Sequence, residues 1–141
     1  MATLEDAILL AVEAHRGQVD KVGQPYILHE LRVMFSLDSE KEKIVGVLHD
    51  VVEDTKYTLD DLRGMGYAED VLAALDCLTK REGERYEAFI ERIKQNPIAR
   101  RVKIADLQDN LDLTRLAEIT QKDVERLKKY RLSLAKLRGE A

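Results

Sequence analysis

The stretch LHDVVEDT, residues 48–55, places four polar side chains in a run of sequence that is otherwise apolar. These side chains belong to His49, Asp50, Glu53 and Asp54. On a helix with 100° per residue, the three acids lie roughly 100°, 40° and 140° around the axis from the histidine, so all four line one stripe. The surrounding apolar residues are Ile44, Val45, Val47, Leu48, Val51 and Val52. A helix that is apolar nearly all round is normally buried, so the stripe is expected to face the interior.

Three carboxylates on a buried helix need a compensating positive charge. They repel each other and lose their hydration, which costs on the order of several kcal/mol per ion. A divalent cation would offset this cost most completely, whereas a polar cleft or buried arginines would do so less completely. The remaining alternative is a solvated surface helix. The stretch therefore predicts a metal site.

The composition is typical of a globular protein with one domain. The 141 residues are 45% hydrophobic and 35% charged, with a net charge of −4. Basic and acidic residues are interleaved, which argues against a nucleic-acid-binding protein. The single cysteine, Cys77, excludes an intrachain disulfide and a cysteine-based zinc site. No apolar run reaches the roughly 18 residues of a membrane span, and no signal peptide is evident, so we expect a cytoplasmic location.

Helix-start signals recur along the chain, whereas strand signals are almost absent. A capping residue followed by an acid three positions later, or by proline, marks the start of a helix. Such pairs are Thr3 with Asp6, Ser39 with Glu42, Thr58 with Asp61, Thr120 with Asp123, and Asn96 with Pro97. The predicted helices span residues 3–16, 27–37, 40–54, 58–65, 68–79, 85–95, 97–117 and 120–138. The sequence therefore predicts a single all-α domain, a bundle of about eight helices, in which the last helix caps the bundle or forms a homodimer contact.

Further ligands for a cation stand elsewhere in the chain. His29 begins a predicted helix in PYILHELRV, and Asp106 lies in VKIADLQDNLDL, with Asn110 one turn later on the same face. With His49 and Asp50 they make a set of two imidazoles and two carboxylates. Such a set suits Mn²⁺, Fe²⁺, Co²⁺ or Zn²⁺ better than Ca²⁺. Four protein ligands would leave a six-coordinate ion with positions for water and a substrate oxygen.

Each of these residues also has a purely structural interpretation. The alternative for His29 is a capping or hydrogen-bonded histidine. The alternative for Asp106 is a salt bridge to a neighbouring cation such as Lys103. Glu53 and Asp54 could equally be a pair of solvated acids at a helix end.

Four motifs occur in one order along the chain: AHRGQ (14–18), GQPYILH (23–29), LHDVVEDT (48–55) and VKIADLQDN (102–110). With these motifs the chain resembles, over about residues 5–117, the HD-domain hydrolases of the RelA/SpoT type. These enzymes remove pyrophosphate from the 3′ position of the alarmones ppGpp and pppGpp. The resemblance implies an all-α HD fold, a single Mn²⁺ and a metal-dependent phosphohydrolase. We expect residues 120–138 to be a capping helix on this single domain.

The resemblance also implies a role for each residue of the set. The metal ligands that it implies are His29, His49, Asp50 and Asp106. Glu53 and Asp54 would activate or position the water that attacks phosphorus, because a nearby carboxylate can accept its proton. Asn110 would contact the nucleotide, and we expect Lys21 and Lys103 to contact it as well. The cation would lower the pKa of its bound water and stabilise the charge that develops.

The chain departs from the family pattern where the nucleotide binds. The loop before the motif proline usually carries Arg-Lys-Ser, and here residues 20–22 read Asp-Lys-Val. Asp112 and Leu113 stand where an arginine and a threonine are usual, and Glu30 replaces the proline that usually follows the motif histidine. Because alarmones carry a large negative charge, exchanging arginines for aspartates should weaken their binding.

Two alternatives to alarmone hydrolysis therefore stay open. One is hydrolysis of another phosphorylated nucleotide, and the other is a metal-stabilised binding or regulatory module without turnover. The length leaves no room for a synthetase or regulatory domain, so we expect any hydrolysis to be stand-alone.

Overall fold

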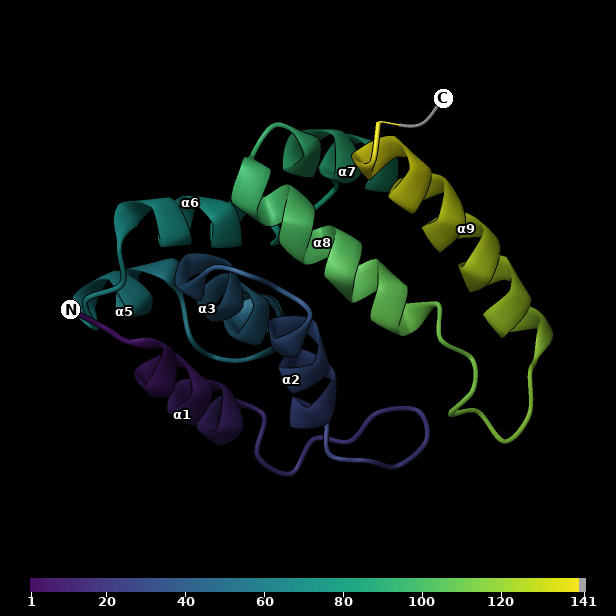
Figure 1. Cartoon of the computed structure of the whole chain (residues 1–141), viewed down its shortest axis with the longest axis horizontal. Coiled ribbons are helices and arrows are strands. Elements are labelled where there is room, and N and C mark those ends of the chain that lie inside the picture. Colours follow the sequence, from purple (N-terminus) through teal and green to yellow (C-terminus); the bar gives the residue numbers. More distant parts are fainter. Residues whose placement is uncertain (140–141) are drawn as a thin grey trace.

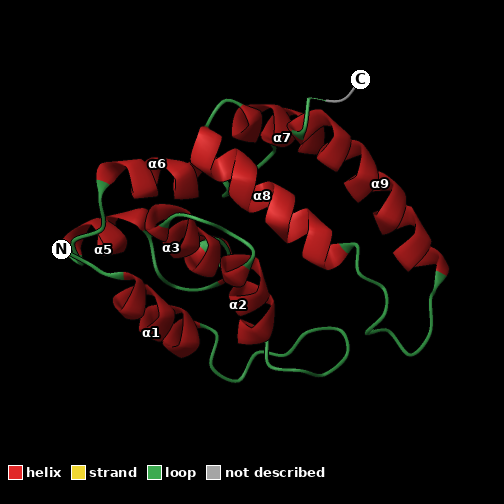
Figure 2. Ribbon diagram, in the orientation of Figure 1, coloured by secondary structure: helices red, strands yellow, loops and turns green. Residues whose placement is uncertain are grey.

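The computed structural model describes residues 1–139, which form nine helices and no strand (Figures 1 and 2). The helices are α1 (Leu4–Ala14), α2 (Ile27–Phe35), α3 (Glu40–Leu48), α4 (Val51–Asp54), α5 (Leu59–Gly64), α6 (Glu69–Cys77), α7 (Tyr86–Lys94), α8 (Pro97–Asn110) and α9 (Gln121–Leu137). The predicted all-α class is confirmed. None of these helices combines the length and the apolar character that crossing a membrane requires.

The predicted helix starts are confirmed by individual hydrogen bonds. Thr3, Thr58 and Thr120 each form a capping box, in which the hydroxyl accepts from the N–H of the acid three residues later and that acid accepts in return. Ser39 and Asn96 accept from a backbone N–H in the first turn of α3 and α8. Each such cap typically contributes about 1 kcal/mol, so these local signals set where the helices begin.

The predicted helix 97–117 is too long, because α8 ends at Asn110. Just beyond its end, the Asp112 carboxylate accepts hydrogen bonds from the Thr114 N–H at 3.0 Å and from the Thr114 hydroxyl at 2.6 Å. Aspartate and threonine side chains that bind nearby backbone groups in this way compete with helix formation. The local turn therefore ends α8 early.

The predicted helix 40–54 is broken at His49 and Asp50, which form a turn between α3 and α4. In a continuous helix the Asp50 N–H would donate to the Gly46 carbonyl. That carbonyl accepts from His49 Nδ1 at 2.5 Å, and the Asp50 N–H donates to Glu30 Oε1 at 3.2 Å. The prediction of one continuous helix with a single polar stripe is therefore wrong.

Helix α3 lies at the centre of the molecule, where it contacts α1, α2, α6 and α8 (Figure 1). All residues from Ile44 to Leu48 are buried. Helix α9 lies along α7 and α8 and buries Leu134 and Leu137 against them. The candidate site lies where α2, the turn after α3 and α8 meet.

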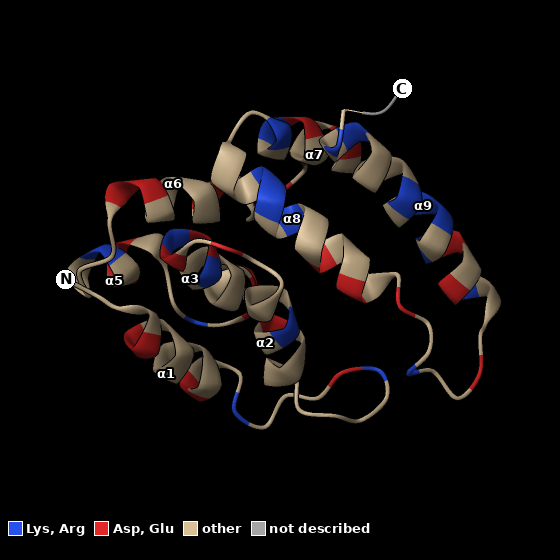
Figure 3. Cartoon of the chain, in the orientation of Figure 1, with Lys and Arg blue, Asp and Glu red and all other residues tan. Residues whose placement is uncertain are grey.

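The charges are distributed as the sequence indicates. Figure 3 shows acidic and basic residues on the same helices, with both signs present on α8 and on α9. Many of the exposed charges are paired, as in the contacts Arg63–Asp60 and Lys41–Asp70. Such pairs contribute little to stability, since exposed ion pairs are typically worth about 0–1 kcal/mol.

Candidate metal centre

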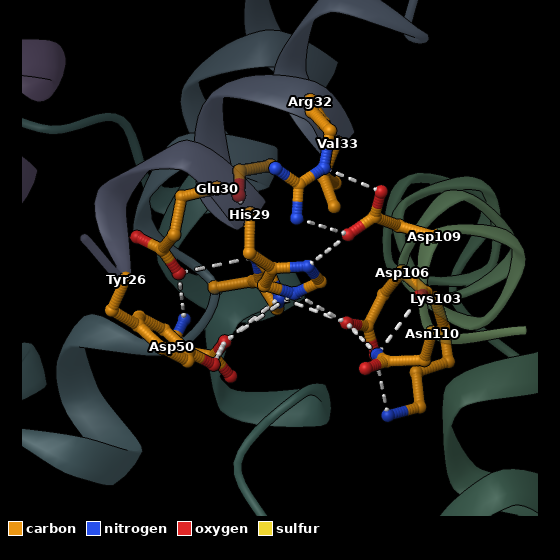
Figure 4. A network of polar contacts seen from close by, with 12 residues as sticks. Tyr26, His29, Glu30, Arg32, Val33, Asp50, Lys103, Asp106, Asp109 and Asn110 are labelled. Atoms are coloured by element: carbon orange, nitrogen blue, oxygen red, sulfur yellow. Dashed lines mark hydrogen bonds and ion pairs between the residues drawn. The ribbon is translucent and has the colours of Figure 1, made fainter. Parts of the chain in front are cut away.

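Segments that are far apart in the sequence bring histidine and carboxylate side chains together (Figure 4). Helix α2 carries His29, the turn after α3 carries His49 and Asp50, and α8 carries Asp106. Asp106 Oδ1 lies 2.9 Å from His29 Nε2 and 3.3 Å from His49 Nε2. Asp50 Oδ2 lies 3.8 Å and 3.2 Å from the same two nitrogens. The structure thus brings all four predicted ligands to one place.

The donor set fits a divalent cation. Potential ligand atoms of His29, His49 and Asp50 all lie within 4.8 Å of one another. Asp106 is not part of that group, but its Oδ1 contacts both imidazole Nε2 atoms. All four side chains are mostly buried, and nitrogen and oxygen donors together suit first-row transition metals. The chain therefore has a possible His/Asp metal site.

Each imidazole is oriented through its Nδ1 atom. His29 Nδ1 lies 2.6 Å from Asp109 Oδ2, and His49 Nδ1 lies 2.5 Å from the Gly46 carbonyl oxygen. Both partners are acceptors, so each Nδ1 carries a proton and each Nε2 faces the centre. Metal-binding histidines are commonly held in this way by a carboxylate or a backbone carbonyl.

The carboxylates of the centre hold protons on the imidazoles. Burial lowers the pKa of His29, but hydrogen bonds to Asp106 and Asp109 outweigh burial and raise the pKa to about 9. Burial also lowers the pKa of His49, but the Asp50 charge and the Asp106 hydrogen bond outweigh burial and raise the pKa well above its usual value. Since histidine ligands must be free of their Nε2 protons, binding a cation would release protons.

Lys103 and Asn110, both predicted to contact substrate, hold Asp106 in place. Lys103 Nζ donates to Asp106 Oδ2 at 2.9 Å. Asn110 Nδ2 donates to the Asp106 carbonyl at 3.0 Å and to Oδ1 at 3.1 Å. Burial alone would raise the pKa of Asp106, but the Lys103 charge and the histidine hydrogen bonds lower the pKa well below its usual value. Asp106 is therefore an anion with fixed geometry.

Glu53 and Asp54 lie on α4 and are exposed to solvent. Glu53 Oε2 accepts from the Lys80 N–H at 3.3 Å, which directs this side chain toward the loop after α6. Partial burial and the charges of Asp50 and Glu53 raise the pKa of Asp54. Asp54 is thus under the electrostatic influence of the centre, and its backbone N–H donates to the Asp50 carbonyl at 2.9 Å. Across residues 1–139, however, the side chain of neither acid hydrogen-bonds to a predicted ligand.

Sequence reasoning missed two residues of the site. The Tyr26 hydroxyl donates to Asp50 Oδ2 at 2.5 Å, and Asp109 orients His29 as described above. Tyr26 precedes His29 by three residues, and Asp109 follows Asp106 by three. Residues three apart share a helix face, so this spacing was the available signal.

A cleft of about 430 Å³ opens beside His29. The residues predicted to contact substrate that line it are Lys21 and Asn110, whereas Lys103 is not among the lining residues. Four of the positions at which the sequence departs from the RelA/SpoT pattern also line the cleft, namely Asp20, Val22, Asp112 and Leu113, whereas the fifth, Glu30, does not. Most of the departures are therefore gathered at one place beside the metal centre.

Most cations of the cleft are paired with carboxylates of the protein. Arg32 donates to both oxygens of Asp109, at 2.7 and 3.1 Å. Arg115 lies 3.1 Å from Asp112, and Arg126 is paired with Asp123. The remaining cation, Lys21, forms no ion pair with any other residue in the part of the chain that the structure describes. The cleft therefore holds a nearly balanced charge.

No model of a protein family matches the chain. By sequence, the chain is 34% identical over 121 residues to a GTP pyrophosphokinase of Streptomyces coelicolor, a match that covers 77% of this chain and 14% of that protein. It is 33% identical over 122 residues to the bifunctional (p)ppGpp synthase/hydrolase SpoT of Escherichia coli, covering 77% of this chain and 17% of SpoT. It is 34% identical over 119 residues to the guanosine-3′,5′-bis(diphosphate) 3′-pyrophosphohydrolase of Haemophilus influenzae, covering 73% and 17%. The chain thus matches only a small part of these longer relatives.

A solved structure shares the fold over nearly the whole chain. It is a metazoan ortholog of SpoT that hydrolyses ppGpp, and it superposes with a TM-score of 0.79 at 24% sequence identity. The superposition covers 99% of this chain and 87% of that one. The sequence similarity and the shared fold together support an HD-domain protein that is similar to the RelA/SpoT hydrolases.

Proposed function

We propose that the chain is a metal-dependent phosphohydrolase of a phosphorylated nucleotide, and most specifically a ppGpp 3′-pyrophosphohydrolase. The observation that carries the proposal is the meeting of two histidines and two aspartates from three segments beside a cleft. Relatives named as ppGpp 3′-pyrophosphohydrolases support the choice of substrate.

The residues that would hold the cation, for which we propose Mn²⁺, are His29, His49, Asp50 and Asp106. When bound, such an ion acts as a Lewis acid on a phosphoryl oxygen and makes a water molecule more acidic. Asp109 holds His29 through Nδ1, while Lys103 and Asn110 hold Asp106. These residues pre-organise the donor set, which limits the reorganisation needed during the reaction.

The proposed step is attack by water on the phosphorus that is bonded to the ribose 3′ oxygen. A bond forms between the water oxygen and phosphorus, and the bond from phosphorus to the 3′ oxygen breaks. The nucleoside 5′-diphosphate leaves through its 3′ oxygen, and the attacked diphosphate, now carrying the water oxygen, is released as pyrophosphate. Glu53, assisted by Asp54, accepts the proton of the attacking water, and the 3′ oxygen gains a proton as it becomes a hydroxyl. Because the pKa of Asp54 is raised, its carboxyl group holds a proton more readily during this proton transfer.

The nucleotide is proposed to occupy the cleft beside His29. Lys21 and Asn110 line it and would contact the substrate. Lys103, in contrast, is already bound to Asp106, so we propose that it balances the charge of this ligand.

A specific observation supports another phosphorylated nucleotide as the second candidate substrate. Three cleft arginines are already paired with Asp109, Asp112 and Asp123. A substrate with fewer phosphates than ppGpp carries less negative charge. Fewer of these arginines would therefore have to leave their aspartate partners in order to bind it. A metal-stabilised module without turnover is the remaining alternative. The presence of Glu53 and Asp54 directly after the turn that carries His49 and Asp50 argues against it.

The test is a substrate panel offered to the full chain with Mn²⁺, containing ppGpp, nucleoside triphosphates and monophosphates, and NADPH. Released pyrophosphate and phosphate are measured for the wild type, Glu53→Gln and the matched control Glu87→Gln on α7. We expect ppGpp turnover that falls at least about 100-fold in Glu53→Gln, the size of a lost general base, and is unchanged in the control. Turnover of another nucleotide alone selects the second candidate, and bound metal without any turnover selects the binding module.

A further inference from the structure

Glu30 is a fully buried carboxylate behind the candidate metal centre. Its exposed fraction is 0%, and it follows His29 directly in α2. It stands where the RelA/SpoT pattern has proline. A carboxylate removed from water is unfavourable unless other groups bind it, so this side chain must have firm partners.

Glu30 contacts groups at the end of α1 and in the turn that carries His49 and Asp50. Its Oε1 accepts from the Asp50 N–H at 3.2 Å and lies 3.5 Å from His49 Nδ1. Its Oε2 lies 3.2 Å from Nε2 of His15, an ion-pair contact without hydrogen-bond geometry. The buried His15 ring is held on its other side by Gln18 Oε1, 2.9 Å from Nδ1. Glu30 therefore connects the end of α1 to the turn that carries two predicted ligands.

The turn needs an acceptor that its own helix cannot supply. The Gly46 carbonyl, which a continuous helix would offer to the Asp50 N–H, accepts from His49 Nδ1. An N–H left without an acceptor in this partly buried position is unfavourable, and Glu30 Oε1 supplies the acceptor. This exchange of partners lets the His49 ring present Nε2 to Asp106 while the backbone stays hydrogen-bonded. The side chain of a proline has no atom that could take this role.

We propose that Glu30 is a positioning residue of the metal centre. Its carboxylate replaces the Gly46 carbonyl as acceptor for the Asp50 N–H and thereby fixes the turn that directs the two ligands at the cation. The inference rests on the metal site proposed above. If Glu30 acts in this way, the length of its side chain matters more for metal binding than its charge. Glutamine keeps an oxygen at the same distance from the backbone, whereas aspartate keeps the charge but places its oxygens closer to the backbone and farther from the Asp50 N–H.

The experiment compares Glu30→Gln and Glu30→Asp with the matched control Glu69→Asp on α6, all in the full chain stripped of metal. Each protein is titrated with Mn²⁺ alone, and the free ion is followed by electron paramagnetic resonance. We expect Glu30→Asp to weaken Mn²⁺ binding about 10–100-fold, the usual effect of losing an outer partner of a ligand, and Glu30→Gln to change it less than about threefold. The control should bind like the wild type.

Amide hydrogen exchange at Asp50, measured by NMR on the metal-free proteins, gives a second readout. The Asp50 amide should exchange faster in Glu30→Asp than in Glu30→Gln or the wild type. His15→Gln, which leaves every predicted ligand in place, should also speed this exchange and weaken Mn²⁺ binding, and it serves if Glu30→Asp does not fold.

Three results would overturn the proposal: Glu30→Asp binding Mn²⁺ as tightly as the wild type, Glu30→Gln losing as much affinity as Glu30→Asp, or unchanged Asp50 exchange in both Glu30→Asp and His15→Gln. Wild-type protein that binds no Mn²⁺ would instead refute the metal site. The exchange measurement on metal-free protein would still decide whether Glu30 fixes the turn.

Discussion

At the scale of single residues, several of the partners that hold the donors of the centre come from other helices. His29, His49 and Asp106 stand in motifs that can be read directly. Asp109 and Glu30 acquire their roles only through contacts with other helices, to His29 and to the backbone of Asp50. Such contacts depend on how helices pack, and helical spacing gives only a weak signal for them. The supports of a metal site are therefore harder to predict than its donors.

The protonation of His29 leads to a prediction about pH. Its pKa is raised to about 9, against a value near 6.5 in an unfolded chain. A group whose pKa rises on folding stabilises the protein fully below the unfolded value and loses that effect as pH rises through the folded value. Metal-free protein should therefore lose stability between about pH 6.5 and 9, and urea unfolding at a series of pH values measures this loss.

The affinity for Mn²⁺ should change in the opposite direction over the same range, because binding the ion releases the imidazole protons. His29→Gln should show a shallower loss of stability with pH than the wild type. Stability of the metal-free wild type that rises from pH 6.5 to 9 would contradict the assigned protonation.

At the scale of helices, local signals predicted starts better than ends and breaks. The caps at Thr3, Thr58 and Thr120 use residues three positions apart, so sequence alone reveals them. The helix breaks at His49 because the His49 imidazole donates to the Gly46 carbonyl, which would otherwise accept from the backbone. The Glu30 carboxylate on α2 accepts from the Asp50 N–H in place of that carbonyl. The apolar pattern continues through the break, so no periodicity could reveal it.

A substitution at Gly46 tests the close contact between α3 and the segment at the end of α2. A Cβ atom at Gly46 would lie 2.6 Å from Leu37 Cδ1 and 3.5 Å from the Met34 backbone. Overpacking a core typically costs about 1–3 kcal/mol, and the better helix propensity of alanine returns up to about 1 kcal/mol. Gly46→Ala should therefore lower the free energy of unfolding by about 1 kcal/mol in urea. Gly64→Ala, where a Cβ meets open space, is the matched control and should be neutral or slightly stabilising, so equal stability of the two variants would contradict this contact.

At the scale of the whole molecule, the sequence predicted the all-α class and the type of site, and it did not predict the cleft. The cleft forms where the loop after α1 meets the end of α8 and the segment beyond it, so its lining comes from parts of the chain that no local pattern connects. The single-domain organisation, the cytoplasmic location and the homodimer stay predictions. The roles of the site residues stay proposals until they are tested.

The main claim is that α2, the turn after α3 and α8 share one cation. Anomalous diffraction from crystals grown with Mn²⁺ tests it most directly. We predict a single strong peak within bonding distance of His29, His49, Asp50 and Asp106, and no such peak in Asp106→Ala crystals. A well-ordered wild-type structure without a peak among these four side chains, or with Mn²⁺ bound elsewhere, would contradict the claim.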